Sequence, residues 1–125
     1  MTTLFYVDDS KDDLFYVDYM SKKQQLDVDL FCFSTAEMAL EALETRAAEG
    51  KTSPDLLVAD LYMPLDSGIV LITRLRLDDR FKAMRLAICS GSDAAEDRAR
   101  SLDAGADVYL EKPLDLAAII LNLEM

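Results

Sequence analysis

The segment 56–64, which reads Leu-Leu-Val-Ala-Asp-Leu-Tyr-Met-Pro, constrains the fold of this chain more than any other. Its first residues are apolar without alternation, which is typical of a short strand buried on both faces of a parallel sheet. Asp60 stands at the carboxyl end of this strand, and ligands bind just outside that edge in open parallel sheets. The carboxylate is therefore a candidate nucleophile or metal ligand. Alternatively, it is a strand-ending Asp that begins a turn.

The composition limits the classes of partner and chemistry. The chain has 125 residues, 51% of them hydrophobic, which fits one compact domain over residues 1–125. Its 24 acidic and 13 basic residues give a net charge of −11, which disfavours nucleic acid and anionic membranes as partners. The absence of His excludes histidine acid–base catalysis and the usual zinc sites. Cys32 and Cys89 lie in apolar runs, as core residues do, and with no signal peptide or membrane-length run we expect a soluble, cytoplasmic protein.

Apolar runs that are typical of strands alternate five times with segments that have the apolar spacing of helices. The runs lie at residues 4–7, 28–33, 56–60, 86–89 and 108–110. This alternation predicts an α/β fold with a parallel five-stranded sheet covered by helices on both faces. Right-handed crossovers leave few topologies, and one of them is the flavodoxin-like (βα)5 strand order 2-1-3-4-5.

Local signals predict where the helices begin and end and which faces they bury. Ser34 and Asp93, each followed three residues later by Glu, begin candidate capping boxes, and Gly105 is a candidate C-terminal cap. The residues that we expect the first helix to bury are Tyr16, Val17 and Met20. The fourth helix is unusually polar, and its expected buried residues are Ala95, Ala99 and Leu102.

Polar residues at the carboxyl ends of the other strands complete a candidate site around Asp60. Asp8 and Asp9 follow the first strand, Ser90 ends the fourth, and Lys112 follows the fifth. Each has an ordinary explanation alone, but in a parallel sheet these ends lie on one edge. Three carboxylates suit Mg²⁺, and a Lys and a Ser hydroxyl bind phosphoryl oxygens. Asp60 is then placed to attack phosphorus and form an acyl phosphate.

These residues resemble the signature of the response-regulator receiver domain of two-component signalling, of the kind found in chemotaxis regulators. The matching motifs are Asp8-Asp9, Asp60-Leu-Tyr-Met-Pro64, Gly68, Ser90-Gly91 and the run 104–113. The resemblance extends from about Leu4 to Leu123. It implies a phosphorylation-dependent switch, not an enzyme acting on other substrates, that takes a phosphoryl group from a histidine kinase or a histidine phosphotransfer protein.

The resemblance also implies a role for each residue of the site. Asp60 is the phosphoacceptor, Lys112 and Ser90 bind the phosphoryl group, and the Lys112–Pro113 bond is cis. The implied ligands of Mg²⁺ are Asp9 directly, Asp8 mainly through water, Asp60, and the backbone carbonyl of Tyr62.

Signal output is implied to depend on two further movements. When Ser90 moves toward the phosphate, Tyr109 turns inward, and the face made by the fourth helix, fifth strand and fifth helix rearranges. This face is also where a dimer or a downstream partner would bind.

Ser67 stands where the family often has Asp, but it preserves a helix N-cap. Tyr62 departs from the commonest pattern of the family. We expect it to crowd the attacking water and slow hydrolysis of the aspartyl phosphate.

Apolar residues beside the acidic pair predict a docking surface for the phosphohistidine donor. Leu14 and Phe15 on the first helix and Leu114 before the last are the residues expected to contact it, unless they are ordinary exposed apolar side chains. Direct binding to nucleic acid or membrane is not expected. Output then passes to a separate protein target or to an effector domain missing from this chain.

Three other functions compete with this interpretation. A haloacid-dehalogenase-type phosphatase also uses a strand-end Asp with Mg²⁺, but it normally carries a second Asp where this chain has Tyr62. A flavodoxin shares the fold, but the acidic pair would repel the flavin phosphate. A receiver-like interaction module that is never phosphorylated is the serious rival, although none of the five key groups is missing.

Overall fold

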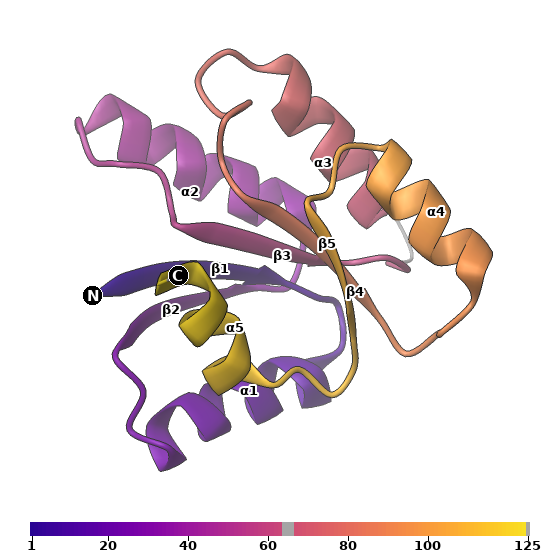
Figure 1. Ribbon diagram of the computed structural model, residues 1–125. Helices are drawn as coiled ribbons and strands as arrows, with labels where there is room; N and C mark the ends of the chain where they lie inside the picture. Colours follow the sequence, from indigo (N-terminus) through magenta and orange to yellow (C-terminus); the bar gives the residue numbers. More distant parts are fainter. Residues whose placement is uncertain (64–66, 125) are drawn as a thin grey trace.

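The computed structural model describes residues 1–63 and 67–124 of the chain. Strands and helices alternate along it, as predicted (Figure 1). The strands are β1 (Thr2–Val7), β2 (Val28–Phe33), β3 (Leu56–Asp60), β4 (Leu86–Ser90) and β5 (Val108–Glu111). The helices are α1 (Lys11–Lys23), α2 (Ala36–Ala48), α3 (Gly68–Leu77), α4 (Ala95–Asp103) and α5 (Leu116–Glu124).

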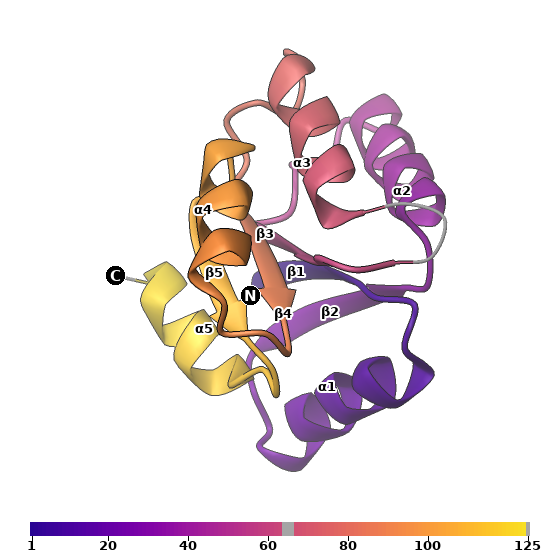
Figure 2. The same ribbon diagram turned by 90° about the vertical axis from the view of Figure 1, so that its right-hand side faces the viewer.

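The five strands form one parallel sheet in the order β2-β1-β3-β4-β5, which confirms the flavodoxin-like topology. Helices α2, α3 and α4 lie on one face of the sheet and α1 and α5 on the other (Figures 1 and 2). The carboxyl ends of the strands lie on the right of Figure 1, and Figure 2 views the molecule from that side. The predicted site residues therefore share one edge.

No helix within the described ranges has both the length and the apolar character needed to cross a membrane.

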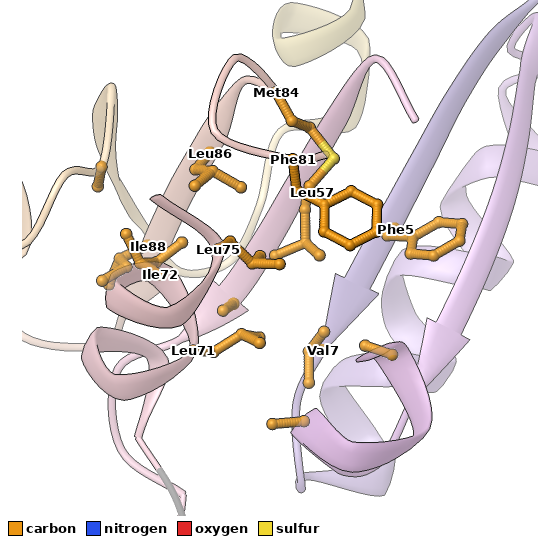
Figure 3. Close-up of a cluster of buried hydrophobic side chains, with 14 of the residues drawn as sticks. Phe5, Val7, Leu57, Leu71, Ile72, Leu75, Phe81, Met84, Leu86 and Ile88 are labelled. Carbon is orange, nitrogen blue, oxygen red and sulfur yellow. The ribbon is translucent and has the colours of Figure 1, made fainter. Parts of the chain in front are cut away.

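The two faces of the sheet carry separate apolar cores. Every residue of β3 and β4 is buried, as their unbroken apolar runs predict. One core packs α2 and α3 against the sheet, with Leu71, Ile72 and Leu75 forming the buried stripe of α3 (Figure 3). The other core lies under α1 and α5. Cys89 is buried, Cys32 is half-buried, and both are free thiols.

The helix ends differ in part from the capping prediction. Thr35, not Ser34, caps α2, because its hydroxyl accepts a hydrogen bond from the backbone N–H three residues later. The proposed capping box at Asp93 is also wrong, since α4 begins after Ala94, which has no side-chain cap. Gly105 follows α4 with a φ of +115°, the left-handed conformation that suits Gly at this position.

The buried faces of two helices are rotated from their predicted positions. In α1 the inward stripe runs through Leu14, Val17 and Ser21, so Tyr16 is exposed. In α4 the inward residues are Asp97 and Ser101. The predicted inward residues of α4, namely Ala95, Ala99 and Leu102, are exposed. Polar partners for Asp97, described below, explain why a carboxylate displaces apolar side chains from this face.

Candidate functional site

Lys112 is the centre of the site and contacts three carboxylates. Its Nζ lies 3.0 Å from Asp60 Oδ1, 2.8 Å from Asp8 Oδ2 and 2.7 Å from Asp13 Oδ2. The ion pairs with Asp8 and Asp60 are buried, so water screens them weakly. The structure thus brings together Asp8, Asp60 and Lys112 as the sequence predicted. Asp13 was not predicted as a member of the site. Its position in the first turn of the helix that follows Asp8 and Asp9 was a signal that could have identified it.

Asp8 is fully buried, and both of its oxygens have partners. Oδ1 accepts the backbone N–H of Ser10 at 2.9 Å, and Oδ2 accepts the hydroxyl of Tyr6 at 2.5 Å as well as the ammonium group. Tyr6 stands two residues earlier on β1, so strand periodicity puts both side chains on one face. Burial raises the pKa of Tyr6, which keeps its phenol a hydrogen-bond donor. Sequence reasoning missed Tyr6.

Asp60 has a raised pKa in this setting. Burial raises the pKa of the carboxyl to about 6, and the charges of Asp8 and Asp9 add to this while Lys112 opposes it. For Lys112, burial disfavours the charged form, but hydrogen bonds to Asp13, Asp8 and Asp60 outweigh it and raise its pKa. A single ammonium shared by three carboxylates cannot neutralise all of them. The site therefore holds excess negative charge that a cation would relieve.

The donor set fits a hard divalent cation. Asp8, Asp60 and Cys89 each place one candidate ligand atom within 4.8 Å of the others. Burial raises the pKa of the Cys89 thiol, so it stays protonated and is a weak ligand. Carboxylate oxygens favour Mg²⁺ or Mn²⁺ over softer ions. Asp9, exposed at the end of β1, is near enough for its charge to raise the pKa of Asp60.

The start of α3 packs closely against the backbone of Asp60. A Cβ on Gly68 would lie 2.5 Å from the carbonyl oxygen of Asp60, so only Gly lets α3 begin here. Ser67 caps α3, as expected, by accepting the N–H of Val70 at 3.2 Å. The motif residue Pro64 lies outside the described residues. The Lys112–Pro113 bond on the opposite side of the site is cis, as implied.

The two implied switch residues meet at one loop residue. Ser90, buried at the end of β4, accepts the N–H of Ser92 through its hydroxyl at 3.0 Å. Tyr109 is also buried, and its hydroxyl donates to the carbonyl oxygen of Ser92 at 2.6 Å. The ring of Tyr109 therefore already lies inward in this structure. A Cβ on Gly91 would meet open space, so the loop has room beside it.

The chain matches a known protein family over nearly its whole length. Residues 4–124 match the model of the response regulator receiver domain. The chain belongs to this family. It is 34% identical over 118 residues to the transcriptional regulatory protein PrrA of Mycobacterium leprae, covering 94% of this chain and 46% of that protein. It is 29% identical over 84 residues to the DNA-binding dual master transcriptional regulator RpaA of Synechocystis, covering 67% of this chain and 35% of that protein. The receiver thus spans about half, or less, of the length of these curated relatives.

Solved structures show the same fold. A putative response regulator from Chloroflexus aurantiacus superposes with a TM-score of 0.81 at 20% identity, covering 98% of this receiver and 94% of that chain. The Mn²⁺-bound form of response regulator Rcp1 superposes with a TM-score of 0.72 at 21% identity, covering 99% and 90% respectively. At these identities the likeness establishes the fold alone.

The expected docking residues of this receiver differ in accessibility. Phe15 is 70% exposed, and its ring stacks on Tyr19 with centroids 6.1 Å apart. Leu14 packs against the core under α1 and α5, and Leu114 is only 5% exposed. Leu114 nevertheless lines a hollow of about 310 Å³ between α1 and the start of α5, together with Tyr16. Of the three predicted docking residues, only Phe15 is therefore fully accessible to a partner.

Tyr62 makes contacts that sequence reasoning missed entirely. Its hydroxyl donates to Asp97 Oδ1 of α4 at 2.7 Å, and Arg100 donates to both residues. The partners are 35 and 38 positions away in the sequence, and no local pattern pairs them.

Proposed function

We propose that this receiver is a phosphorylation-dependent switch in which Asp60 accepts a phosphoryl group from a phosphohistidine. The observation that carries the proposal is the buried ion pair of Asp60 and Lys112 at 3.0 Å, on the sheet edge where ligands bind. A carboxylate oxygen of Asp60 attacks phosphorus as the donor's P–N bond breaks. The electron pair of that bond returns to the imidazole ring. Lys112 stays charged and offsets negative charge on the transferring oxygens.

A divalent cation supports this chemistry. The groups that would hold Mg²⁺ are Asp8, Asp9, Asp60 and the backbone carbonyl of Tyr62. When bound, the ion supplies positive charge to the transferring group. At neutral pH Asp60 is ionised even with its pKa near 6, so the nucleophile is in its reactive form. The chain then promotes only its own phosphorylation and dephosphorylation and acts on no other substrate.

The switch acts on the face formed by α4, β5 and α5. Ser90 and Tyr109 both hydrogen-bond to the backbone of Ser92, so a movement of Ser90 toward the phosphoryl group is linked to Tyr109 through this residue. Apolar side chains are exposed on each of the three elements of this face, namely Leu102, Val108 and Leu121. They provide a surface for a second copy or a downstream partner in the cytoplasm. Because the curated relatives extend well beyond the matched region, an effector domain is a second route for output.

Incubation with acetyl phosphate and Mg²⁺, followed by intact-mass measurement, tests the proposal. One acid-labile phosphoryl group on the wild-type chain supports the switch. An unmodified mass would instead favour the alternative, a receiver-like interaction module that is never phosphorylated.

Replacing Phe15 by Ala should slow transfer from a phosphohistidine protein about tenfold, because the most exposed apolar contact of the docking surface is lost. Transfer from acetyl phosphate should not change, since that donor needs no docking surface. Leu77→Ala, at the C-terminal end of α3, removes an exposed apolar side chain away from the site and is the control. Wild-type transfer rates in Phe15→Ala would remove the docking role.

Replacing Tyr62 by Asn should shorten the lifetime of the aspartyl phosphate several-fold. The physical reason is that the tyrosine ring, held by hydrogen bonds two residues from Asp60, restricts the approach of water. Loss of acid-labile phosphate after removal of the donor measures the lifetime. An unchanged rate would show that this side chain does not limit hydrolysis.

A further inference from the structure

Helix α4 is held to the rest of the molecule by an unusual polar contact. Its inward residues are Asp97 and Ser101, not apolar side chains. The side chain of Asp97 is only 12% exposed, and it accepts hydrogen bonds from Tyr62 at 2.7 Å and Arg100 at 3.1 Å. Tyr62 comes from the loop after β3, two residues beyond Asp60. The contact therefore joins the segment that carries the phosphoacceptor directly to α4.

The same contact is connected to the switch residues. The Ser92 side chain lies near enough to Asp97 to help lower its pKa, and the backbone of Ser92 binds Ser90 and Tyr109. Asp97 thus receives one connection from the loop after β3 and another from the loop after β4. Hydrogen bonds from Tyr62 and Arg100, together with the nearby Ser92 side chain, lower the pKa of Asp97, so it is a charged acceptor, and bonds to charged acceptors are the stronger ones.

We propose that Tyr62 is a positioning residue that fixes α4 through Asp97 and Arg100, and that occupation of the site at Asp60 reaches α4 through this contact as well as through Ser90 and Tyr109. The second half rests on the proposed function. If the loop after β3 shifts to accommodate a phosphoryl group, the backbone of Tyr62 moves with it. The hydrogen bond from the Tyr62 hydroxyl to Asp97 then changes as well. Because α4 has few inward apolar groups to hold it, a change in one polar contact has a large effect on its position.

Hydrogen exchange of the α4 amides tests the contact itself. Tyr62→Phe removes only the hydroxyl, and α4 should then exchange roughly three- to tenfold faster while β1 and β3 keep wild-type protection. Asp97→Ala should have a similar effect, and the double variant should resemble either single one, because both changes break the same contact. Tyr19→Phe, at a comparably exposed tyrosine of α1, is the matched control and should leave α4 unchanged.

A second arm adds Mg²⁺ and beryllofluoride, which mimics the phosphoryl group. In the wild type the exchange of α4 and of β5 should both change. In Tyr62→Phe the change in α4 should shrink at least about twofold, whereas the change around Tyr109 in β5 should persist. A merely structural role of Tyr62 would not separate these two responses.

The outcomes separate the inference from the function on which it rests. Wild-type exchange of α4 in Tyr62→Phe, or a full α4 response to beryllofluoride in that variant, overturns the inference. Failure of the wild type to respond to beryllofluoride or to take up phosphate overturns the proposed function and the signalling half of the inference. Faster exchange of α4 in Tyr62→Phe would still establish the contact in that case.

Discussion

Replacing Lys112 by Met should lower the free energy of unfolding by about 3 kcal/mol in metal-free buffer. The substitution keeps a long apolar side chain but removes the ammonium group that contacts Asp8, Asp60 and Asp13 within 3.0 Å. Two of these carboxylates are buried, and removing one partner of a buried ion pair leaves uncompensated charge in a poorly solvated place. Urea unfolding followed by circular dichroism measures the loss. Mg²⁺ should restore part of it, because a cation can neutralise the same carboxylates.

Lys22→Met is a matched control for this prediction. Lys22 also pairs with a carboxylate, Asp18, at 3.0 Å, but the two side chains are 76% and 47% exposed. Exposed ion pairs contribute little to stability, so this variant should unfold at nearly the wild-type urea concentration. Equal losses in the two variants would show that burial of the Lys112 cluster is not what makes it strong.

Replacing Asp60 by Asn should stabilise the metal-free protein at pH 7. In the folded chain the pKa of Asp60 is raised to about 6, mainly by burial, from an ordinary value of about 4 in the unfolded chain. Between these values the folded state binds more protons than the unfolded state, so this residue's contribution to stability falls as the pH rises from about 4 to about 6. Above pH 6 the cost of ionising Asp60 is fully present, on the order of 1–3 kcal/mol. Asn removes that cost and still offers Lys112 a hydrogen-bond acceptor.

Two comparisons check the sign of this effect. Without metal, the difference in unfolding free energy between Asp60→Asn and wild type should vanish below about pH 4, because the carboxyl is protonated in both the folded and the unfolded state there. With saturating Mg²⁺ at pH 7 it should shrink or reverse, since Asp60 becomes a ligand. An Asp60→Asn variant less stable than wild type at pH 7 without metal would contradict the excess negative charge inferred for this site.

The sheet and its functional edge were predictable because they follow from local patterns. The apolar runs at β3 and β4 leave no polar face, and in a parallel sheet such runs put Asp60 and Ser90 side by side at their ends. Lys112 follows from the same rule. The pairing of Tyr6 with Asp8 also lies within reach of sequence reasoning, because Asp8 directly follows β1 and continues the alternation of side chains that starts within the strand.

The inward face of α4 was not predictable in the same way. Helical spacing of Ala95, Ala99 and Leu102 predicted an apolar inward stripe, but Asp97 and Ser101 take that place. Asp97 can face inward because Tyr62, 35 positions away in the sequence, donates a hydrogen bond to it. The spacing of apolar residues identifies the buried face of a helix only when that face is made of apolar side chains. Contacts made by polar side chains across loops leave no comparable pattern in the sequence.

Intact-mass measurement after incubation with acetyl phosphate, performed on wild type and Asp60→Asn with and without Mg²⁺, tests the central claim most directly. The arrangement of Asp60 against Lys112 predicts one acid-labile phosphoryl group on the wild type in the presence of Mg²⁺. It predicts little modification without the metal and none on Asp60→Asn, although that variant should be folded. An unmodified wild type, or equal modification of Asp60→Asn, would contradict the assignment of Asp60 as the phosphoacceptor.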